Sequence, residues 1–462
     1  MAGGVERRTV MVIFFAALAL CALITKPHAT GWNDASRLAT VDALTADHTF
    51  AIDGSPFAIG LGDEIRFRGR TYSDKPPLLA VLGAGAALAL APLGITLRHS
   101  PGTAIYLVTL LTVGVSFALG CCYAYGFQRL LGIAPRIAIA VAALTGIATL
   151  ALPYATVLTN HVPCGASALA ACYHLDRARS GRLLHVALGG LFLGLCYAFD
   201  AAGAMFAIAG AVLLWDAPLR RWLLCAAAGL PVVVLQLCYN VLISGSILPT
   251  VFNLSVWSDP SLPLHAESMQ VLRYFSPAEY LGFIVSLLIG ARGLFSYTPL
   301  MLVAGYGFVV MWRDRERTGR LALAILATSA VFFLAIVFLQ NDAHARNFGE
   351  RRYVDLFFVL CIPLGPALAS IRTSAARAAV LALTAASVAI AALGTVAPFG
   401  GGPGESGFVF ATAEFAALAR RAPVQAVLDV LLLIVATVLV LRLTARALGA
   451  APATAAEVPL RG

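Results

Sequence analysis

The fold class follows from residues 7–37, RRTVMVIFFAALALCALITKPHATGWNDASR, in which an apolar run lies between charged segments. Residues 9–25 contain no charged side chain and follow Arg7 and Arg8. About 20 apolar residues cross a bilayer as one helix, and cytoplasmic flanks carry an excess of Lys and Arg. We therefore predict a first membrane span that leaves the cytoplasm. A cleaved signal peptide is the alternative, but KPHATG, which follows the run, offers no A-x-A-like cleavage site.

The composition extends this prediction to the whole chain. Its 462 residues are 60% hydrophobic and 12% charged, and the mean hydropathy is +0.87. Soluble proteins carry about 25% charged residues, so a soluble enzyme, a nucleic-acid-binding protein and a disordered chain are excluded. The net charge of +9 is then expected to reflect membrane orientation. The sequence predicts an all-α polytopic membrane protein.

Short basic loops decide how many apolar runs cross. The thirteen runs are residues 9–25, 78–97, 103–127, 137–158, 163–175, 183–199, 201–215, 222–243, one within 280–312, 321–340, 353–371, 378–397 and 424–441. Six arginine-containing loops, at 129–136, 177–182, 220–221, 313–320, 372–377 and 442–446, would all face outward if every run crossed. If 78–97 instead lies along the interface, about 12 helices cross, and these loops and both termini become cytoplasmic. We predict this topology, with spanning by 78–97 as the alternative.

The remaining charge gathers on the outer face. The predicted outer loops are 27–102, 244–279, 341–352 and 398–423, and they hold many acids as well as bases. Orientation alone would not place basic residues there, so we expect a folded polar site at this face. A transporter more often carries charges on interrupted helices at mid-membrane.

Two motifs stand out in the first outer loop. Asp34 and Arg37 lie three residues apart at a predicted helix start, where Asn33 or Asp34 can cap the helix or Asp34 can act as a general base. Further on, the segment YSDKPPL runs from Tyr72 and holds Lys75 just before an apolar run, because its two prolines prevent a helix from continuing. An ammonium group there can bind a lipid phosphate or simply anchor the chain at the interface.

These motifs resemble those of the bacterial aminoarabinose transferases and protein O-mannosyltransferases of the GT-C superfamily. Further similar segments are TNHVP at 159–163, YNVLISGSILPTVF at 239–252, RGLFSYTPLMLVAGYG at 292–307 and NFGERRYVDLFFVLCIPL at 347–364. The resemblance extends from about residue 8 to 370. It implies a transmembrane catalytic module over 1–371, and 372–462 are then C-terminal helices with an outer loop and a cytoplasmic tail.

The resemblance also implies residue roles. Asp34 matches the catalytic carboxylate that activates the acceptor, and Arg37 lies beside it. Tyr72 and Lys75 match the segment that holds the phosphate of a polyprenyl-phosphate sugar. Asn33 stands where an acid is more common in the family, so a neighbour such as Asp42 is an alternative base.

Other candidates come from the need for cations around a lipid-phosphate leaving group. Arg351 and Arg352 are candidates with Lys75, and Arg98 and Arg292 lie where apolar segments meet the outer face. The remaining candidates are His161, which is either a packing or a site residue, and Glu350 and Tyr353, which belong either to a salt-bridge cluster or to the donor site. No cofactor is certain. A divalent metal is an open alternative, because Asp342 and His344 have a spacing that permits one together with Asp34.

We therefore predict a multi-pass glycosyltransferase of a bacterial inner membrane. It would move a sugar from a polyprenyl-phosphate carrier to a lipid, glycan or protein acceptor on the outer face, with Asp34 as base and no nucleic-acid partner. The alternatives are a lipid-linked sugar flippase or other transporter, and a non-catalytic lipid-binding assembly subunit.

Overall fold

The computed structural model describes residues 2–257, 259, 276–339, 347–400 and 406–449, and this part of the chain is predominantly helical. The helices are α1 Ala2–Ile24, α2 Trp32–Asp42, α3 Leu78–Leu90, α4 Pro101–Thr109, α5 Val115–Leu130, α6 Pro135–Ile147, α7 Ala151–Tyr154, α8 His161–Arg177, α9 Leu183–Phe199, α10 Phe206–Leu214, α11 Leu219–Ser244, α12 Pro277–Ile289, α13 Leu294–Tyr297, α14 Met301–Arg313, α15 Arg320–Leu339, α16 Tyr353–Leu360, α17 Leu364–Ser370, α18 Ser374–Val396, α19 Gly407–Arg421 and α20 Pro423–Leu448. The strands are β1 Glu64–Phe67 and β2 Arg70–Ser73.

Several helices can span a membrane. In the described ranges, seven are long and apolar enough, and there are eight if α16 and α17, which are bent by 41° relative to each other, count as one span. Five further apolar helices are shorter, among them α9 with 17 residues. At 1.5 Å per residue such a helix extends about 25 Å, against about 30 Å for a hydrocarbon core. Twelve crossings would therefore have to include some of these shorter helices.

The centre of the bundle is α8, which packs against α5, α9 and α16, while α9 packs in turn against α11. Nearly all of α8 is buried. Small residues allow the close helix approach: a side chain at Gly190 would overlap the backbone of Cys225, and one at Gly165 would come within 2.7 Å of the Val354 carbonyl. Such crossings of small residues are typical of helix association in membranes. The C-terminal helices join the bundle through contacts of α18 with α7 and of α20 with α6.

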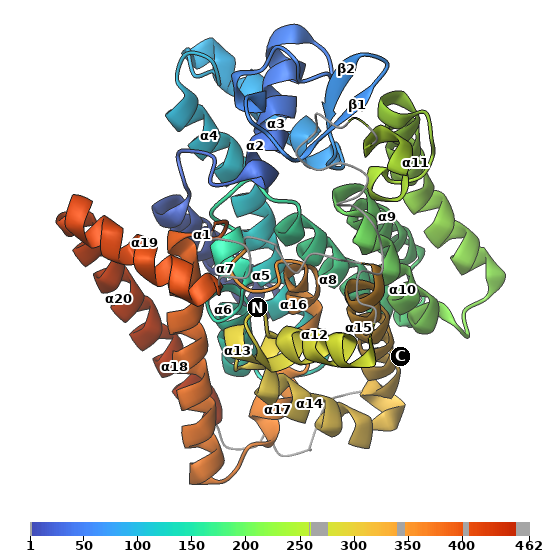
Figure 1. Ribbon diagram of the computed structural model, residues 1–462. Helices are drawn as coiled ribbons and strands as arrows, with labels where there is room; N and C mark the ends of the chain where they lie inside the picture. The colour runs from blue at the N-terminus through green and yellow to red at the C-terminus, as the bar shows by residue number, and fades with distance from the viewer. Residues whose placement is uncertain (1, 258, 260–275, 340–346, 401–405, 450–462) are drawn as a thin grey trace.

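The first outer loop forms a cap at one end of the bundle. Figure 1 shows α2, α3, α4 and the two strands grouped together at this end. Helix α3 packs against α2 and α4, and Gly83 of α3 lies so close to Val41 that a Cβ would come within 2.9 Å of its side chain. The segment after the double proline thus packs against the helix that carries Asp34 and Arg37.

The two strands form a β-hairpin, which the all-α prediction missed. Glu64 pairs with Ser73 and Phe67 pairs with Arg70, so only Arg68 and Gly69 form the turn. Both turn residues have positive φ, 51° and 75°, as a tight hairpin turn of this handedness requires. Because Glu64 and Ser73 pair at the open end of the hairpin, the flanking residues Asp63 and Asp74 lie side by side, directly before Lys75.

Candidate functional site

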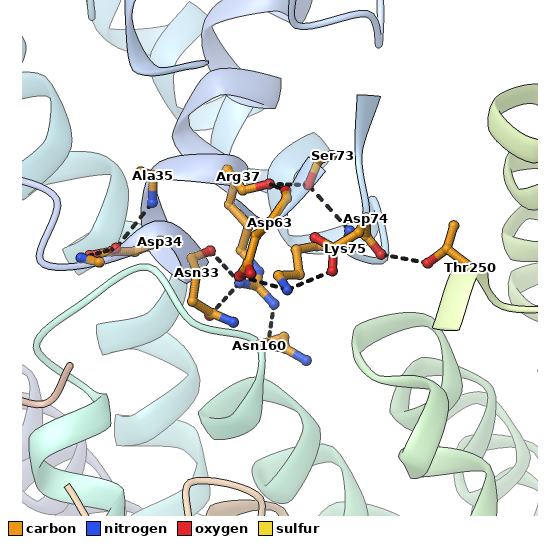
Figure 2. Close-up of polar contacts among 12 residues, drawn as sticks. Asn33, Asp34, Ala35, Arg37, Asp63, Ser73, Asp74, Lys75, Asn160 and Thr250 are labelled. Carbon is orange, nitrogen blue, oxygen red and sulfur yellow. Dashed lines mark hydrogen bonds and ion pairs between the residues drawn. The ribbon is translucent and has the colours of Figure 1, made fainter. Parts of the chain in front are cut away.

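The residues brought together by the hairpin are Asp63 and Asp74, and both contact Lys75. The Lys75 Nζ lies 2.8 Å from Asp63 Oδ2 and 2.8 Å from Asp74 Oδ2 (Figure 2). The three side chains keep only 13–14% of their exposure. The second oxygen of Asp74, Oδ1, is buried and has no hydrogen-bond partner among the described residues. The Thr250 hydroxyl donates to the Asp74 carbonyl and ties this turn to the segment after α11.

The two carboxylates differ in their affinity for protons. Burial raises the pKa of Asp74, and the negative charge of Asp63 raises it further against the opposing effect of Lys75. Burial also acts on Asp63, but the charges of Lys75, Arg351 and Arg37 outweigh it and hold the pKa of Asp63 below its usual value. Asp74 therefore takes up a proton at a higher pH than Asp63 does.

Arg37 extends this cluster toward the bundle. Its Nη1 donates to the Asn33 carbonyl and to Asn33 Oδ1, each at 2.6 Å, and its Nη2 donates to Asn160 Oδ1 at the start of α8. The Arg37 Nε is buried without a hydrogen-bond partner in the described ranges. Burial lowers the pKa of Arg37 to about 10, against the raising effect of Asp74 and Asp200, so the guanidinium stays charged at neutral pH.

A second polar layer lies below Arg37 in the ends of the bundle helices. Asn160 donates through Nδ2 to Asp200, and the Asp200 side chain also accepts from the backbone of Ala202, where it caps the turn after α9. His161 Nδ1 lies 3.1 Å from Asp355 Oδ1 and 3.6 Å from Asp200 Oδ2. Polar contacts therefore run without a break from α2 to α8, to the α9 end and to α16.

Three of these residues can hold a metal ion. Ligand atoms of His161, Asp200 and Asp355 lie within 4.8 Å of one another. One imidazole with two carboxylates is a donor set that first-row divalent ions accept. The metal ligands suggested by the sequence, Asp342 and His344, lie outside the described residues.

Asp34 takes the capping role. Its Oδ2 accepts hydrogen bonds from the backbone and hydroxyl of Thr30, and its Oδ1 accepts from the backbone of Gly31 and Ala35, all between 2.7 and 3.0 Å. Burial raises the pKa of Asp34, while these hydrogen bonds lower it. Figure 2 shows its carboxylate turned away from Lys75. An ionised carboxylate has about four acceptor sites, so an acceptor hydroxyl would have to replace one of these four donors.

Two other candidates lie in structural contacts of the cap. Tyr72, in β2, packs against an apolar cluster formed by Ile65, Tyr239, Ile243, Val256 and Trp257. Arg98 forms ion pairs with Asp42 at 3.0 Å and Asp47 at 2.6 Å, which connect the segment before α4 to the end of α2. Asp42, the alternative base, is thus already paired with a cation.

The candidates of the later segments differ among themselves. Glu350 pairs with Arg352 at 3.1 Å, and the buried hydroxyl of Tyr353 donates to the Leu287 carbonyl, which joins α16 to α12. Arg351 donates to Asn347 at 3.3 Å, and its charge acts on Asp63. Arg292 lies in the turn between α12 and α13, where its backbone amide donates to Ser286.

Sequence reasoning missed Asp63, and it did not single out Asp74 or Asn160. The signal for Asp63 was the segment EIRFRGRTYS, residues 64–73. Residues Arg68-Gly69 between two runs with β-branched and aromatic side chains indicate a hairpin turn. Pairing those strands symmetrically around the turn places Asp63 opposite Asp74.

Comparisons with known proteins address the fold. No protein-family model matches the chain, and no curated protein sequence does either. Among solved structures, ArnT from Cupriavidus metallidurans in the apo state is similar at 15% identity and TM-score 0.51, covering 96% of this chain and 77% of ArnT. The archaeal oligosaccharyltransferase AglB from Archaeoglobus fulgidus, in complex with an inhibitory peptide and a dolichol-phosphate, is similar at 14% identity and TM-score 0.51. That match covers 86% of this chain and 56% of AglB.

The chain has the GT-C fold. ArnT and AglB are both GT-C glycosyltransferases that use polyprenyl-phosphate-linked sugars, so the fold that the outer-loop motifs implied is confirmed. A GT-C fold is built on a polytopic membrane bundle, and the apolar helices of this chain agree with that architecture. The cap over the bundle, with its Asp63–Lys75–Asp74 cluster, carries largely buried charge on the first outer loop.

Proposed function

We propose that the chain is an integral-membrane glycosyltransferase that takes a sugar from a polyprenyl-phosphate carrier. The observation that carries the proposal is the pair of cations between the cap and the end of a GT-C bundle: Arg37, which is buried, and Lys75, whose side chain is 13% exposed. Cations of this kind form charge-assisted hydrogen bonds with a phosphate. AglB was solved with a dolichol-phosphate, which supports a polyprenyl-phosphate donor in this fold.

The reaction would proceed as follows. The acceptor oxygen attacks the anomeric carbon of the sugar, the bond from that carbon to the phosphate oxygen breaks, and the phosphate leaves with the electron pair. Lys75 and Arg37 stabilise the charge that develops on the leaving phosphate. A carboxylate takes the proton of the acceptor, and attack from the face opposite the phosphate inverts the anomeric centre.

Asp34 is the proposed base, and this role requires an acceptor hydroxyl to replace one of its hydrogen-bond donors. Of its four donors, three are backbone amides and one is the Thr30 hydroxyl, at 3.0 Å. The hydroxyl is the donor that can rotate away at little cost, since a backbone amide can leave only if the helix start moves. An acceptor hydroxyl that replaced it would donate its proton to Asp34 Oδ2, and the burial that raises the pKa of Asp34 favours that transfer.

The proposed topology places this site on the outer face of a bacterial inner membrane. Twelve helices would cross, both termini would be cytoplasmic, and α3 would lie along the interface, with residues 1–371 forming the catalytic module. A cysteine at exposed position 99, His99→Cys, tests it in a variant without Cys122 and Cys238. An outside-only thiol reagent should label it, and labelling from the cytoplasm alone would mean that α3 crosses.

The activity test uses purified protein in proteoliposomes with a radiolabelled polyprenyl-phospho-sugar and candidate lipid, glycan and peptide acceptors. Formation of a labelled glycoside, lost in Lys75→Met and kept in an exposed control such as Arg136→Gln, is the expected result. Movement of the labelled lipid across the bilayer without a new glycosidic bond would identify a flippase. Binding of the labelled donor without glycoside formation and without movement across the bilayer would identify an assembly subunit.

A further inference from the structure

A polar cavity lies at the end of the bundle opposite the cap. It measures about 250 Å³, and its charged lining residues are Arg179, Arg221, Arg320 and Asp216. These residues come from the segments after α8 and α10 and from the starts of α11 and α15. The cavity is thus built where four helices end or begin, and no residue of the proposed glycosyltransferase site belongs to it.

The helix directions fix its distance from that site. Helix α8 begins at His161 in the polar layer and ends at Arg177, next to the cavity. Its 17 residues extend about 25 Å at 1.5 Å per residue. Under the proposed topology this end of the bundle faces the cytoplasm.

The arginines of the cavity are unequally paired. Arg320 forms a two-contact ion pair with Asp216 at 2.5 and 2.7 Å, and Arg179 lies 3.6 Å from Asp176. Arg221 donates only weakly, to the Ala178 carbonyl at 3.4 Å, and its Nε is buried without a partner. In the described ranges no carboxylate forms an ion pair with Arg221. Three guanidinium groups therefore face two carboxylates, and one unneutralised cation points to an anionic ligand.

The surroundings of the cavity are those of a membrane surface. Trp215 is 66% exposed and Leu219 is 70% exposed, and they flank the lining residues on the chain. The Arg320 guanidinium lies 5.8 Å from the centre of the Trp215 ring. Exposed tryptophans with neighbouring arginines mark the boundary between hydrocarbon and headgroups. Basic pockets between helices on the cytoplasmic side bind anionic lipid headgroups.

We propose that this cavity binds the phosphodiester headgroup of an anionic phospholipid through Arg221 and Arg179. With about 30 Å³ for each water, the cavity replaces about eight waters, which is room for a phosphate and its glycerol. The single excess cation matches the single negative charge of a phosphodiester. Arg320, held by Asp216, forms the wall of the cavity on the α15 side.

The experiment measures lipid binding to the purified full-length protein by native mass spectrometry and by thermal shift. Phosphatidylglycerol should bind and raise the melting temperature, while phosphatidylcholine should do neither. In Arg221→Gln the affinity for phosphatidylglycerol should fall about tenfold, the effect of losing one charge-assisted hydrogen bond. Arg136→Gln, an exposed arginine outside the cavity, should bind as the unmodified protein does.

Further arms separate the alternatives. If Arg221→Gln does not fold, Arg179→Gln replaces it, because the Arg179 side chain is 42% exposed. Equal binding of phosphatidylglycerol by the unmodified protein and a folded cavity variant, or equal binding of the two lipids, would overturn the proposal. Millimolar inorganic phosphate that stabilises the protein without any effect of phosphatidylglycerol would assign the cavity to a soluble phosphate and reject the lipid.

Discussion

Replacing Asp74 by asparagine should make Lys75 more available to a phosphate. In the structure Lys75 is held by two carboxylates, each at 2.8 Å, so a donor phosphate that approaches Lys75 must compete with at least one of them. Asp63 is stabilised in its ionised form by Arg37 and Arg351 as well as by Lys75. Lys75 and Arg37 also favour ionised Asp74, but burial and the charge of Asp63 outweigh them and raise its pKa, and one of its oxygens is buried without a partner among the described residues. Asp74 is therefore the carboxylate that should give way.

The size of the effect follows from the contact that is lost. A hydrogen bond to a charged group contributes about 1.5–3 kcal/mol, and about 1.4 kcal/mol is a factor of ten in affinity. The asparagine still offers a carbonyl oxygen to Lys75, so the lower end of the range applies. We expect Asp74→Asn to bind undecaprenyl phosphate about tenfold more tightly at neutral pH.

The pH dependence has a definite sign. The pKa of Asp74 is raised, so this carboxylate takes up a proton at a higher pH than a free aspartate does. Protonation removes the charge that competes for Lys75. The unmodified protein should therefore bind undecaprenyl phosphate more tightly as the pH falls, whereas Asp74→Asn should lack the part of this gain that Asp74 provides.

Equilibrium binding of a fluorescent polyprenyl phosphate to protein in detergent, from about pH 8 to about pH 5, measures both effects. The phosphate itself titrates near pH 6, so the comparison is between variants at each pH. Glu414→Gln, which changes an exposed carboxylate outside the cap, is the control. Weaker binding by Asp74→Asn, or the same pH dependence in both proteins, would refute the reasoning.

Three further predictions concern single side chains. The pKa of Asp63 is lowered, so its ionised form stabilises the fold above its unfolded pKa of about 3.9, and this stability is lost as the pH falls through the folded pKa. In thermal unfolding at pH 7, Asp63→Asn should lower the free energy of unfolding by about 1–3 kcal/mol, whereas Asp74→Asn should raise it. Asp34→Asn should abolish sugar transfer, and Thr30→Val should keep it. If Asp34→Asn loses about 1 kcal/mol of stability from the lost helix cap but keeps full activity, Asp34 is a helix cap and not the base. If His161 and its two carboxylates hold a metal, EDTA should lower transfer by the unmodified protein and Mn²⁺ should restore it, but Mn²⁺ should not restore transfer in His161→Gln. Transfer that EDTA does not affect would contradict the metal site.

The helical membrane fold could be predicted from the sequence because apolar runs and basic loops act locally. The fold class and the motifs for Arg37 and Lys75 required only residue type and spacing. The hairpin was missed because its strands have four residues each and lie inside a polar loop, where no long periodic pattern exists. Asp63 lies twelve positions before Lys75, so their contact cannot be predicted unless the hairpin between them is recognised.

The sequence left two roles open for Asp34, a helix cap and a general base, because two positions of one helix turn compete for the site. Asn33 and Arg37 are four residues apart and therefore share a face, and Arg37 indeed donates to both oxygens of Asn33. Asp34 is rotated from that face and lies at the third helical position, where a carboxylate reaches back to the unpaired amides before the helix. The sequence placed Asp34 and Arg37 together by their spacing of three, whereas the free backbone amides at the helix start bind the carboxylate. A catalytic role for Asp34 thus requires an acceptor that enters on the Thr30 side of α2, and the Thr30→Val variant reports on that side alone.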